Sequence, residues 1–174
     1  MSLLCLLTKM KAKRLAISAL LTAILLTAQV MLASLPNIEL VTLLIILYTL
    51  CFKPRLTLCA VSAFVLLEGI LYGFGIWWFS WIYIWALLVL LTYLMRNVKS
   101  HIAWCVFSGA FGLCFGALCA IPSLFAGGFY AAVSYWFNGI PFDIAHCVGN
   151  TLAMIILYKP LRKCFEFLSA KYCE

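Results

Sequence analysis

The sequence predicts an all-α integral membrane protein, a six-transmembrane-helix bundle with both termini in the cytoplasm. Of its 174 residues, 67% are hydrophobic and only 10% are charged. A soluble domain is about half apolar and about a quarter charged. This chain therefore has too little polar surface for a water-soluble globule, and it is far too hydrophobic for a disordered chain. The apolar stretches and the positions of the basic residues point to the same class.

Six stretches approach the ~20 apolar residues that a helical span requires. They cover residues 15–35, 38–52, 56–72, 79–95, 101–121 and 141–158. The second is short for a span, and the third and fourth are divided at Gly73 and Gly75, where two glycines suit a tight reversal. The basic segment 1–14 and the basic tail 159–174 flank these spans, so residues 15–158 are expected to form one membrane domain.

The basic residues are distributed in a way that sets the orientation. All 12 Lys and Arg residues fall in the two tails and in the connections after the second and fourth spans. The other three connections, around Pro36, around Gly73 and over residues 121–139, contain none. Cytoplasmic loops are enriched in Lys and Arg, so both termini are expected inside. The net charge of +7 is explained by attraction to the cytoplasmic leaflet and requires no nucleic acid.

Three of the five acidic residues are embedded among apolar residues, where ionisable groups are costly and usually functional. These are Glu39, Glu68 and Asp143, and the topology predicts that they converge in the outer half of the bundle, where the sequence has no Lys or Arg. Asp143, His146 and Asn150 are spaced i, i+3, i+7, so they share one helix face. Alternatively, Glu39 and Asp143 cap helix N-termini, and His146 is an interhelical hydrogen-bond partner.

Aromatic residues are concentrated near the outer ends of the spans. They include Tyr72, Phe74, Trp77, Trp78, Phe79, Trp81, Tyr83, Trp85, Phe129, Tyr130, Tyr135, Trp136 and Phe137. Such rings also anchor proteins at membrane interfaces without binding anything. Together with the acids they predict an outward-facing pocket for a flat, donor-rich or cationic molecule. Its expected substrate-binding residues are Asn37, Glu39, Glu68, Tyr72, Trp77, Trp78, Asp143, His146 and Asn150.

No motif indicates catalysis or metal binding. The nine cysteines include no C-x-x-C pair and lie mostly in or beside apolar spans, where they act as small apolar filler. The chain has no phosphate-binding loop of the G-x-x-x-x-G-K-[ST] type. We therefore expect no catalytic residues and no metal site.

The first span presents small residues at helical spacing. Ala16, Ala19 and Ala23 include a small-xxx-small pair, which lets another helix approach closely within lipid. The partner is either a different protein or another helix of the same bundle.

With these features the chain resembles, over nearly its whole length, the substrate-binding S-component of energy-coupling factor (ECF) vitamin transporters. The resemblance is carried by the alanine-containing first span, by residues 36–41 (PNIELV), by residues 68–73 (EGILYG) with Trp77 and Trp78, and by residues 139–143 (GIPFD) leading to His146, Gly149 and Asn150. It implies a six-helix bundle that holds its substrate near the outer face, beneath outer loops that act as lids.

The resemblance also implies a set of partners. Ala16, Ala19 and Ala23 would dock on a shared transmembrane T-component, and two separate cytoplasmic ATPases would hydrolyse ATP. The chain itself is then expected to bind no cofactor and to be no enzyme. It would be a multi-pass protein of a bacterial or archaeal cytoplasmic membrane that imports a vitamin-like micronutrient.

The charge pattern restricts the ligand. Anionic vitamins would need Lys or Arg in the outer half, and the sequence has none there. The favoured ligand is a donor-rich or cationic heterocycle such as queuine, a queuosine precursor, because a carboxylate accepts two hydrogen bonds from a guanine-like edge. Thiamine or its pyrimidine precursor, and riboflavin, are the alternatives. Two other classes stay open: a membrane-embedded enzyme that uses Asp143 and His146, and a structural membrane subunit without a ligand.

Overall fold

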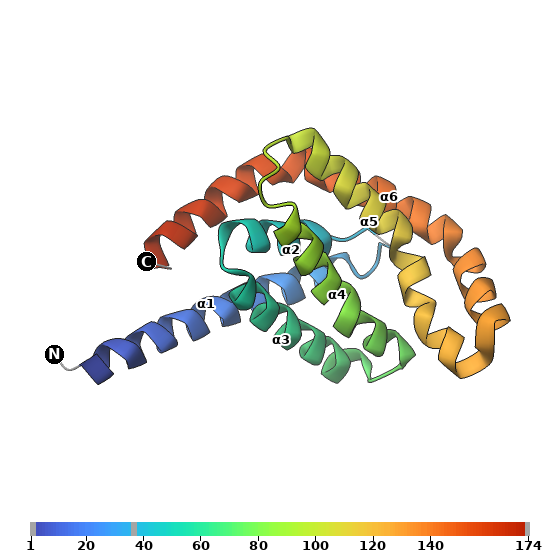
Figure 1. Ribbon diagram of the computed structural model, residues 1–174, viewed down its shortest axis with the longest axis horizontal. Coiled ribbons are helices and arrows are strands. Elements are labelled where there is room, and N and C mark those ends of the chain that lie inside the picture. Colours follow the sequence, from blue (N-terminus) through green and yellow to red (C-terminus); the bar gives the residue numbers. More distant parts are fainter. Residues whose placement is uncertain (1–2, 36–37, 173–174) are drawn as a thin grey trace.

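The structure is a computed structural model that describes residues 3–35 and 38–172, and the regular structure within these ranges is helical. The elements are α1 (Leu3–Leu32), α2 (Val41–Cys51), α3 (Pro54–Tyr72), α4 (Ile76–Leu94), α5 (His101–Cys119) and α6 (Ile121–Tyr172) (Figure 1). All except α2 are long and apolar enough to cross a membrane. The all-α class and the presence of several helices of membrane-spanning length are thus confirmed, while the six-span count and the orientation stay predictions.

Helix α2 is the shortest and most deeply buried element. The span expected at residues 38–52 forms a helix of 11 residues, about 16 Å long at 1.5 Å per residue. The hydrocarbon core of a bilayer is about 30 Å thick, and an apolar helix of this length is typical of a buried core helix. Residues 41–49 are all buried, so α2 serves as the core around which the other helices pack.

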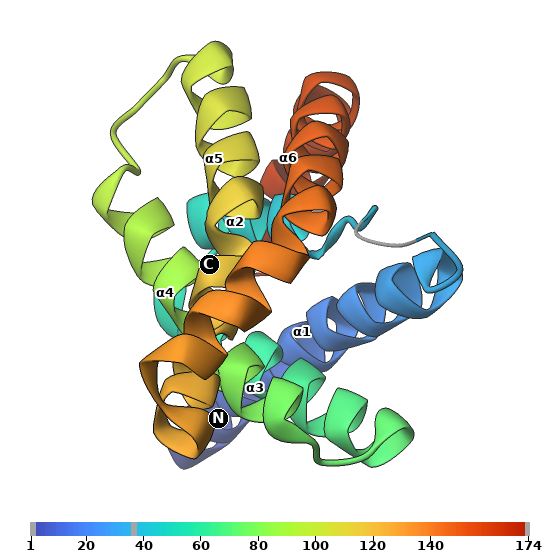
Figure 2. The same cartoon turned by 90° about the vertical axis from the view of Figure 1, so that its right-hand side faces the viewer.

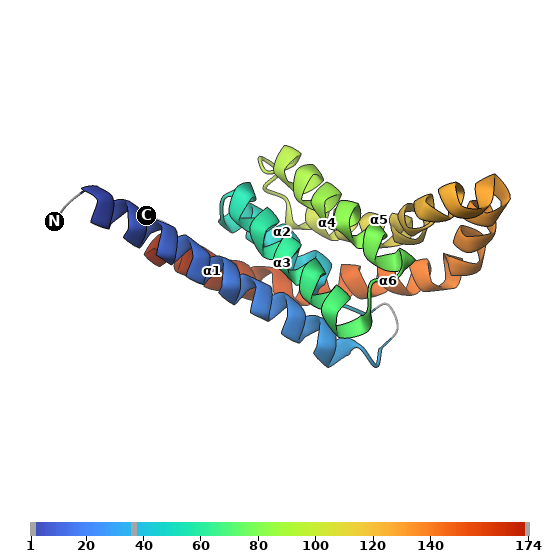
Figure 3. The same cartoon turned by 90° about the horizontal axis from the view of Figure 1, so that it is seen from below.

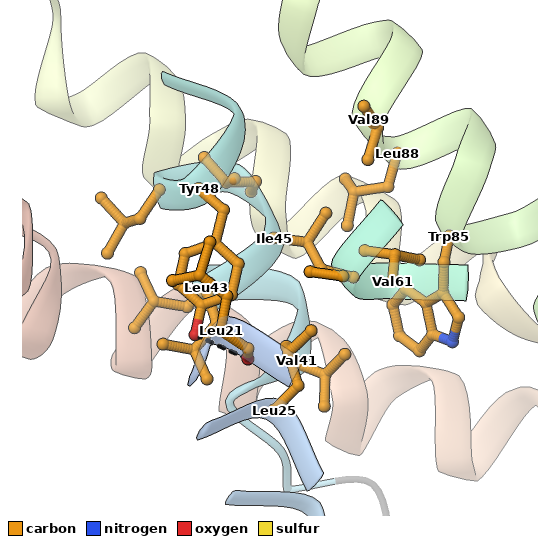
Figure 4. Packing of buried hydrophobic residues seen from close by; sticks show 14 of the residues in the cluster. Leu21, Leu25, Val41, Leu43, Ile45, Tyr48, Val61, Trp85, Leu88 and Val89 are labelled. Atoms are coloured by element: carbon orange, nitrogen blue, oxygen red, sulfur yellow. Dashed lines mark hydrogen bonds between the residues drawn. The ribbon is translucent and has the colours of Figure 1, made fainter. Parts of the chain in front are cut away.

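The surroundings of α2 are seen in Figure 4, where Val41, Ile45 and Tyr48 lie among side chains from α1, α3 and α4. The Tyr48 hydroxyl donates a hydrogen bond of 3.3 Å to the carbonyl oxygen of Leu21 on α1. This bond satisfies a phenol that is fully buried. Burial of α2 on all sides explains why its sequence is apolar at nearly every position and has no polar face.

Local sequence signals set several helix ends. Pro54 is the first residue of α3, a position where its missing N–H costs nothing. Gly73 ends α3 with a φ of 88°, a conformation that favours glycine, so the reversal expected there is present. The Ser100 side chain accepts a hydrogen bond from the backbone N–H of Ala103 and thereby caps α5.

Helix α6 differs most from expectation. Residues 121–139 were expected as an outer connection and residues 141–158 as a span, yet α6 (Ile121–Tyr172) consists of two helical pieces, 121–127 and 129–172, that meet at Gly128, where φ is 78° and the backbone is not helical. Residues 129–172 extend for about 65 Å. Most of the expected outer connection is therefore helical, and its part after Gly128 is continuous with the sixth expected span.

The expected basic tail is also helical, although Pro160 lies within it. Packing against α2 explains the continuation. Phe165 is buried, with its ring centroid 5.0 Å from that of Tyr48. The Ser169 hydroxyl donates a hydrogen bond of 2.6 Å to the carbonyl oxygen of Cys51, the last residue of α2. These contacts extend the bundle beyond the span that hydropathy predicts.

The start of α1 and the end of α6 lie at the same end of the molecule, as Figures 1 and 3 show. The α2–α3 and α4–α5 connections, which carry Lys53, Arg96 and Lys99, lie nearer to that end, and Arg55 is in the first turn of α3 that follows. The α3–α4 and α5–α6 turns, which carry no Lys or Arg, lie toward the opposite end. This arrangement agrees with the separation of charge on which the predicted orientation rests.

Helices α5 and α6 lie side by side from their shared turn (Figures 1 and 2). A stripe of glycines on α5 faces α6. A Cβ atom at Gly112 would lie 2.9 Å from the carbonyl carbon and oxygen of His146, and one at Gly116 would lie 2.5 Å from the Asp143 carboxylate. Gly109 similarly faces Thr151. Small residues of this kind let transmembrane helices approach closely.

The glycine stripe generates a stability prediction. Gly112→Ala should lower the free energy of unfolding by about 1–3 kcal/mol, because the new methyl group meets backbone atoms that cannot turn away. This loss should occur although alanine is the better helix former. The measurement is reversible unfolding in mixed micelles. Gly139→Ala on α6 is the matched control, since a Cβ there would meet nothing within 4 Å; equal losses in the two variants would contradict close α5–α6 packing.

Candidate functional site

The buried face of α6 carries the polar residues that were expected on one helix face. Asp143, His146 and Asn150 are 4%, 3% and 1% exposed. The Asn150 amide donates a hydrogen bond of 3.5 Å to the carbonyl oxygen of Ser108 on α5. Pro141 and Asp143 lie inside α6 rather than at its start, so the alternative that Asp143 caps a helix N-terminus is wrong.

The carboxylate of Glu39 has two structural roles. It accepts hydrogen bonds from the backbone N–H of Thr42 at 2.9 and 3.2 Å, which caps the start of α2. It also lies 3.1 Å from Nε2 of His146 on α6. The capping alternative for Glu39 is therefore correct, and the pair with His146 joins the start of α2 to the middle of α6.

The carboxylate of Asp143 lies one helical turn from His146. Its Oδ1 accepts a hydrogen bond of 2.8 Å from the backbone N–H of Gly116 on α5. Its Oδ2 is buried and has no hydrogen-bond partner among residues 3–35 and 38–172. We use "orphan atom" for a buried polar atom without a partner in that part of the chain. The Thr42 hydroxyl oxygen is a second orphan atom, and we call Glu39, Thr42, Asp143 and His146 the polar cluster.

Glu68 is 2% exposed and lies on the inward face of α3, one turn after Phe64. Its Oε1 is an orphan atom. No ion pair or hydrogen bond within the described chain joins Glu68 to Glu39 or Asp143. Of the three carboxylates expected to converge, Glu39 contacts His146, Asp143 lies one helical turn from His146, and Glu68 lies on α3 and is bonded to neither acid within the described chain.

A row of aromatic rings bridges the space between Glu68 and the polar cluster. Its neighbouring centroids are 5.9 Å apart for Phe64 and Trp81, 5.8 Å for Trp81 and Trp85, 5.5 Å for Trp85 and Phe115, and 4.8 Å for Phe115 and His146. These separations are typical of aromatic pairs in contact. We call these five residues the aromatic row. It crosses α3, α4, α5 and α6, and its two ends lie beside buried acids.

The other expected binding residues lie at different distances from this centre. Trp77 contacts Trp81 of the aromatic row, with centroids 5.1 Å apart. Trp78 donates its indole N–H to the carbonyl oxygen of Val65 at 2.8 Å and lines an apolar groove of about 250 Å³ between α3 and α4. Tyr72 is 54% exposed at the end of α3. Asn37 lies outside the described residues.

The aromatic residues expected around an entrance divide into two groups. Trp81 and Trp85 point into the bundle, and Trp85 is only 2% exposed. The rings after the α5–α6 turn are exposed, led by Tyr130 at 87% and Phe137 at 70%. Exposed rings in a segment without charge suit the membrane interface, which favours the anchoring role for this second group.

Three further residues belong to this centre but were not predicted from the sequence: Thr42, Phe115 and Gly116. Phe115 packs on His146, and Gly116 binds Asp143. A signal for the α5 residues was present, because Gly109, Gly112 and Gly116 stand at i, i+3, i+7 and mark a helix face in close contact. Nothing in the sequence distinguishes Thr42 from other threonines in apolar helices.

The small residues of the first span lie on the outside of α1. Ala16, Ala19 and Ala23 are exposed, whereas Ser18 and Thr22 between them are buried. The Thr22 hydroxyl bonds to the carbonyl oxygen of Ala60 on α3 at 3.0 Å. Packing of α1 within the bundle therefore uses the face with Ser18 and Thr22 and leaves the alanines open.

Within the described ranges, no three His, Cys, Asp or Glu side chains are grouped as a metal site requires, and the seven cysteines from Cys51 to Cys164 are free thiols. The sequence matches no family model, and no curated protein or solved structure matches it. The site is therefore interpreted from its own chemistry.

The pair at the start of α2 generates the second prediction. Glu39→Ala should lower the free energy of unfolding by about 3 kcal/mol, because it removes a helix cap and leaves His146 buried without its partner. Reversible unfolding in mixed micelles provides the measurement. Glu166→Ala is the control, since its pair with Arg162 at 2.8 Å is exposed and such pairs contribute at most about 1 kcal/mol. A smaller loss of unfolding free energy for Glu39→Ala than for Glu166→Ala would show that the Glu39–His146 pair does not stabilise the fold.

Proposed function

We propose that the chain is the substrate-binding membrane subunit of an ECF-type importer, a six-helix bundle with both termini in the cytoplasm. It captures a vitamin-like heterocycle at the outer face of a bacterial or archaeal cytoplasmic membrane. Separate ATPases power transport through a transmembrane T-component, and this chain carries out no chemistry of its own.

The observation that carries this proposal is the pair of orphan carboxylate oxygens on Asp143 and Glu68. A buried acceptor without a donor costs about 1–3 kcal/mol, and more when it is charged. Among the residues described, the ion pairs are His146 with Glu39 and Arg162 with Glu166, so neither of these two acids is paired with a cation of the chain. A ligand with N–H groups or positive charge would supply the missing donors.

The aromatic row supports the same class of ligand. Its rings extend between the two acids, and planar heterocycles bind well against aromatic side chains with a few polar contacts that fix their orientation. Queuine carries N–H donors on a planar ring, and thiamine carries a cationic ring and an amino group. Riboflavin, which is uncharged, depends least on the carboxylates.

The third prediction concerns these acids. Asp143→Asn and Glu68→Gln should each weaken ligand binding at least about tenfold, because a hydrogen bond to a charged group contributes about 1.5–3 kcal/mol. The measurement is calorimetric titration of the purified protein in nanodiscs with queuine, thiamine and riboflavin. Glu166→Gln, an exposed acid, is the control and should bind as the wild type does.

Two outcomes would contradict the pocket. If both acid variants bind the ligand as tightly as the wild type, the carboxylates do not contact it. If the wild type binds none of the three compounds and carries no small molecule through purification, the chain is not the binding subunit of an importer for this class of ligand.

The fourth prediction concerns docking. Ala19→Leu and Ala23→Leu should abolish uptake and co-purification with the T-component while leaving ligand binding intact, because a bulky side chain prevents close helix approach. The measurement is substrate uptake in cells that express the whole importer. Ala110→Leu places the same change on an exposed position of α5 and should have no effect. Normal uptake by both α1 variants would exclude this face as the docking surface.

A further inference from the structure

Trp85 lies at the centre of the aromatic row, and its indole N–H has no acceptor among the described residues. The side chain is 2% exposed, and its Nε1 is an orphan atom. An indole N–H is a donor only, so no rearrangement of its own proton can satisfy it. Buried tryptophans usually find an acceptor for this group.

Two other tryptophans of the same chain have found one. Trp104 is fully buried, and its N–H donates to the carbonyl oxygen of Val98 at 3.1 Å. The N–H of Trp78 donates to Val65. Of the two described tryptophans that are almost completely buried, Trp104 therefore has an acceptor and Trp85 has none, although the Trp85 ring packs closely against Trp81 and Phe115.

The position of Trp85 relates this donor to the two orphan carboxylate oxygens. One ring, Phe115, separates it from His146, and Asp143 is one turn from His146 on α6. In the other direction Trp81 and Phe64 separate it from the α3 turn that carries Glu68. The row therefore presents an acceptor near each end and a donor in the middle.

From this arrangement we infer that Trp85 determines ligand specificity by donating its indole N–H to a carbonyl oxygen of the ligand. The inference rests on the proposed function and narrows it to planar heterocycles in which a ring carbonyl lies beside N–H donors, as on the pairing edge of a guanine-type base. A carboxylate accepts from the ring N–H and the exocyclic amine, and Trp85 donates to the carbonyl. Molecules with donors alone satisfy only the acids.

The test compares two probes that differ in the atom Trp85 would bind, 7-deazaguanine and its 6-thio analogue, in which sulfur replaces the carbonyl oxygen. Sulfur is a weaker acceptor. Wild-type protein in nanodiscs should bind the oxygen compound about tenfold more tightly by calorimetry. Trp85→Phe keeps an aromatic ring but removes the donor, so it should bind both probes with nearly equal affinity. Trp104→Phe, the control, should retain the preference of the wild type.

The free energy of unfolding of the ligand-free protein is a second measurement. It distinguishes a tryptophan that binds ligand from one whose N–H is bonded within the fold. Both Trp85→Phe and Trp104→Phe shrink a buried ring and should lose some stability through the cavity they leave. Trp85→Phe should lose less than Trp104→Phe, because it removes a donor that has no acceptor, whereas Trp104→Phe also breaks a hydrogen bond. A loss of stability in Trp85→Phe equal to that in Trp104→Phe would show that the indole already has an acceptor, which overturns the inference.

The outcomes separate this inference from the proposal beneath it. If the wild type binds both probes equally, and Asp143→Asn and Glu68→Gln both lose binding, the proposed function is retained and the role of Trp85 is overturned. If the wild type binds neither probe, the guanine-type ligand is wrong and the inference falls with it, whereas binding of thiamine or riboflavin by the same preparation would preserve the proposed function.

Discussion

The complete burial of α2 is the constraint on which the arrangement of the other helices depends. Helix α2 has 11 residues, about half of the ~20 in a helix that crosses a bilayer alone, and nine of its residues are buried by neighbouring elements. Helix α6 holds it at both ends: His146 pairs with Glu39 at its start, and Ser169 bonds to Cys51 at its last residue. A single long helix thereby fixes the position of α2 within the bundle.

This arrangement explains why the three buried acids are not equivalent. Glu39 is engaged by the Thr42 backbone and by His146, so its charge is compensated within the fold. Asp143 uses one oxygen to bind Gly116 and leaves the other as an orphan atom, and Glu68 also leaves one. The acids that hold the structure together and those with capacity for a ligand are therefore different residues. An intramembrane carboxylate is a reason to suspect function, but the partners of each oxygen decide which one.

The sequence predicted the features that follow from hydropathy and from glycine. The helical class and the reversal at Gly73 reflect local chemistry that a single chain segment displays. The small residues of α1 were also visible in the sequence, but spacing alone did not decide whether Ala16, Ala19 and Ala23 face the bundle or its surroundings. The sequence marked the second span as short, but it did not predict that α2 has only 11 residues or that α6 continues past Pro160, because both depend on what packs against these segments. A helix end in the middle of an apolar stretch has no local signal, and the contacts of Phe165 and Ser169 with α2 join residues more than 100 positions apart.

The site shows the same division. Spacing alone placed Asp143, His146 and Asn150 on one face of α6, and all three are buried. Spacing could not predict the contact between Glu39 and His146, which are 107 positions apart in the sequence. It also could not predict that Trp85 is buried in the core whereas the rings near the α5–α6 turn are exposed. Since α6 is continuous from Asp143 to Ser169, the orphan oxygen of the site and the contacts that hold the end of α2 belong to one helix. A ligand that bound Asp143 would act directly on the element that positions the core, so binding and packing share the same physical support.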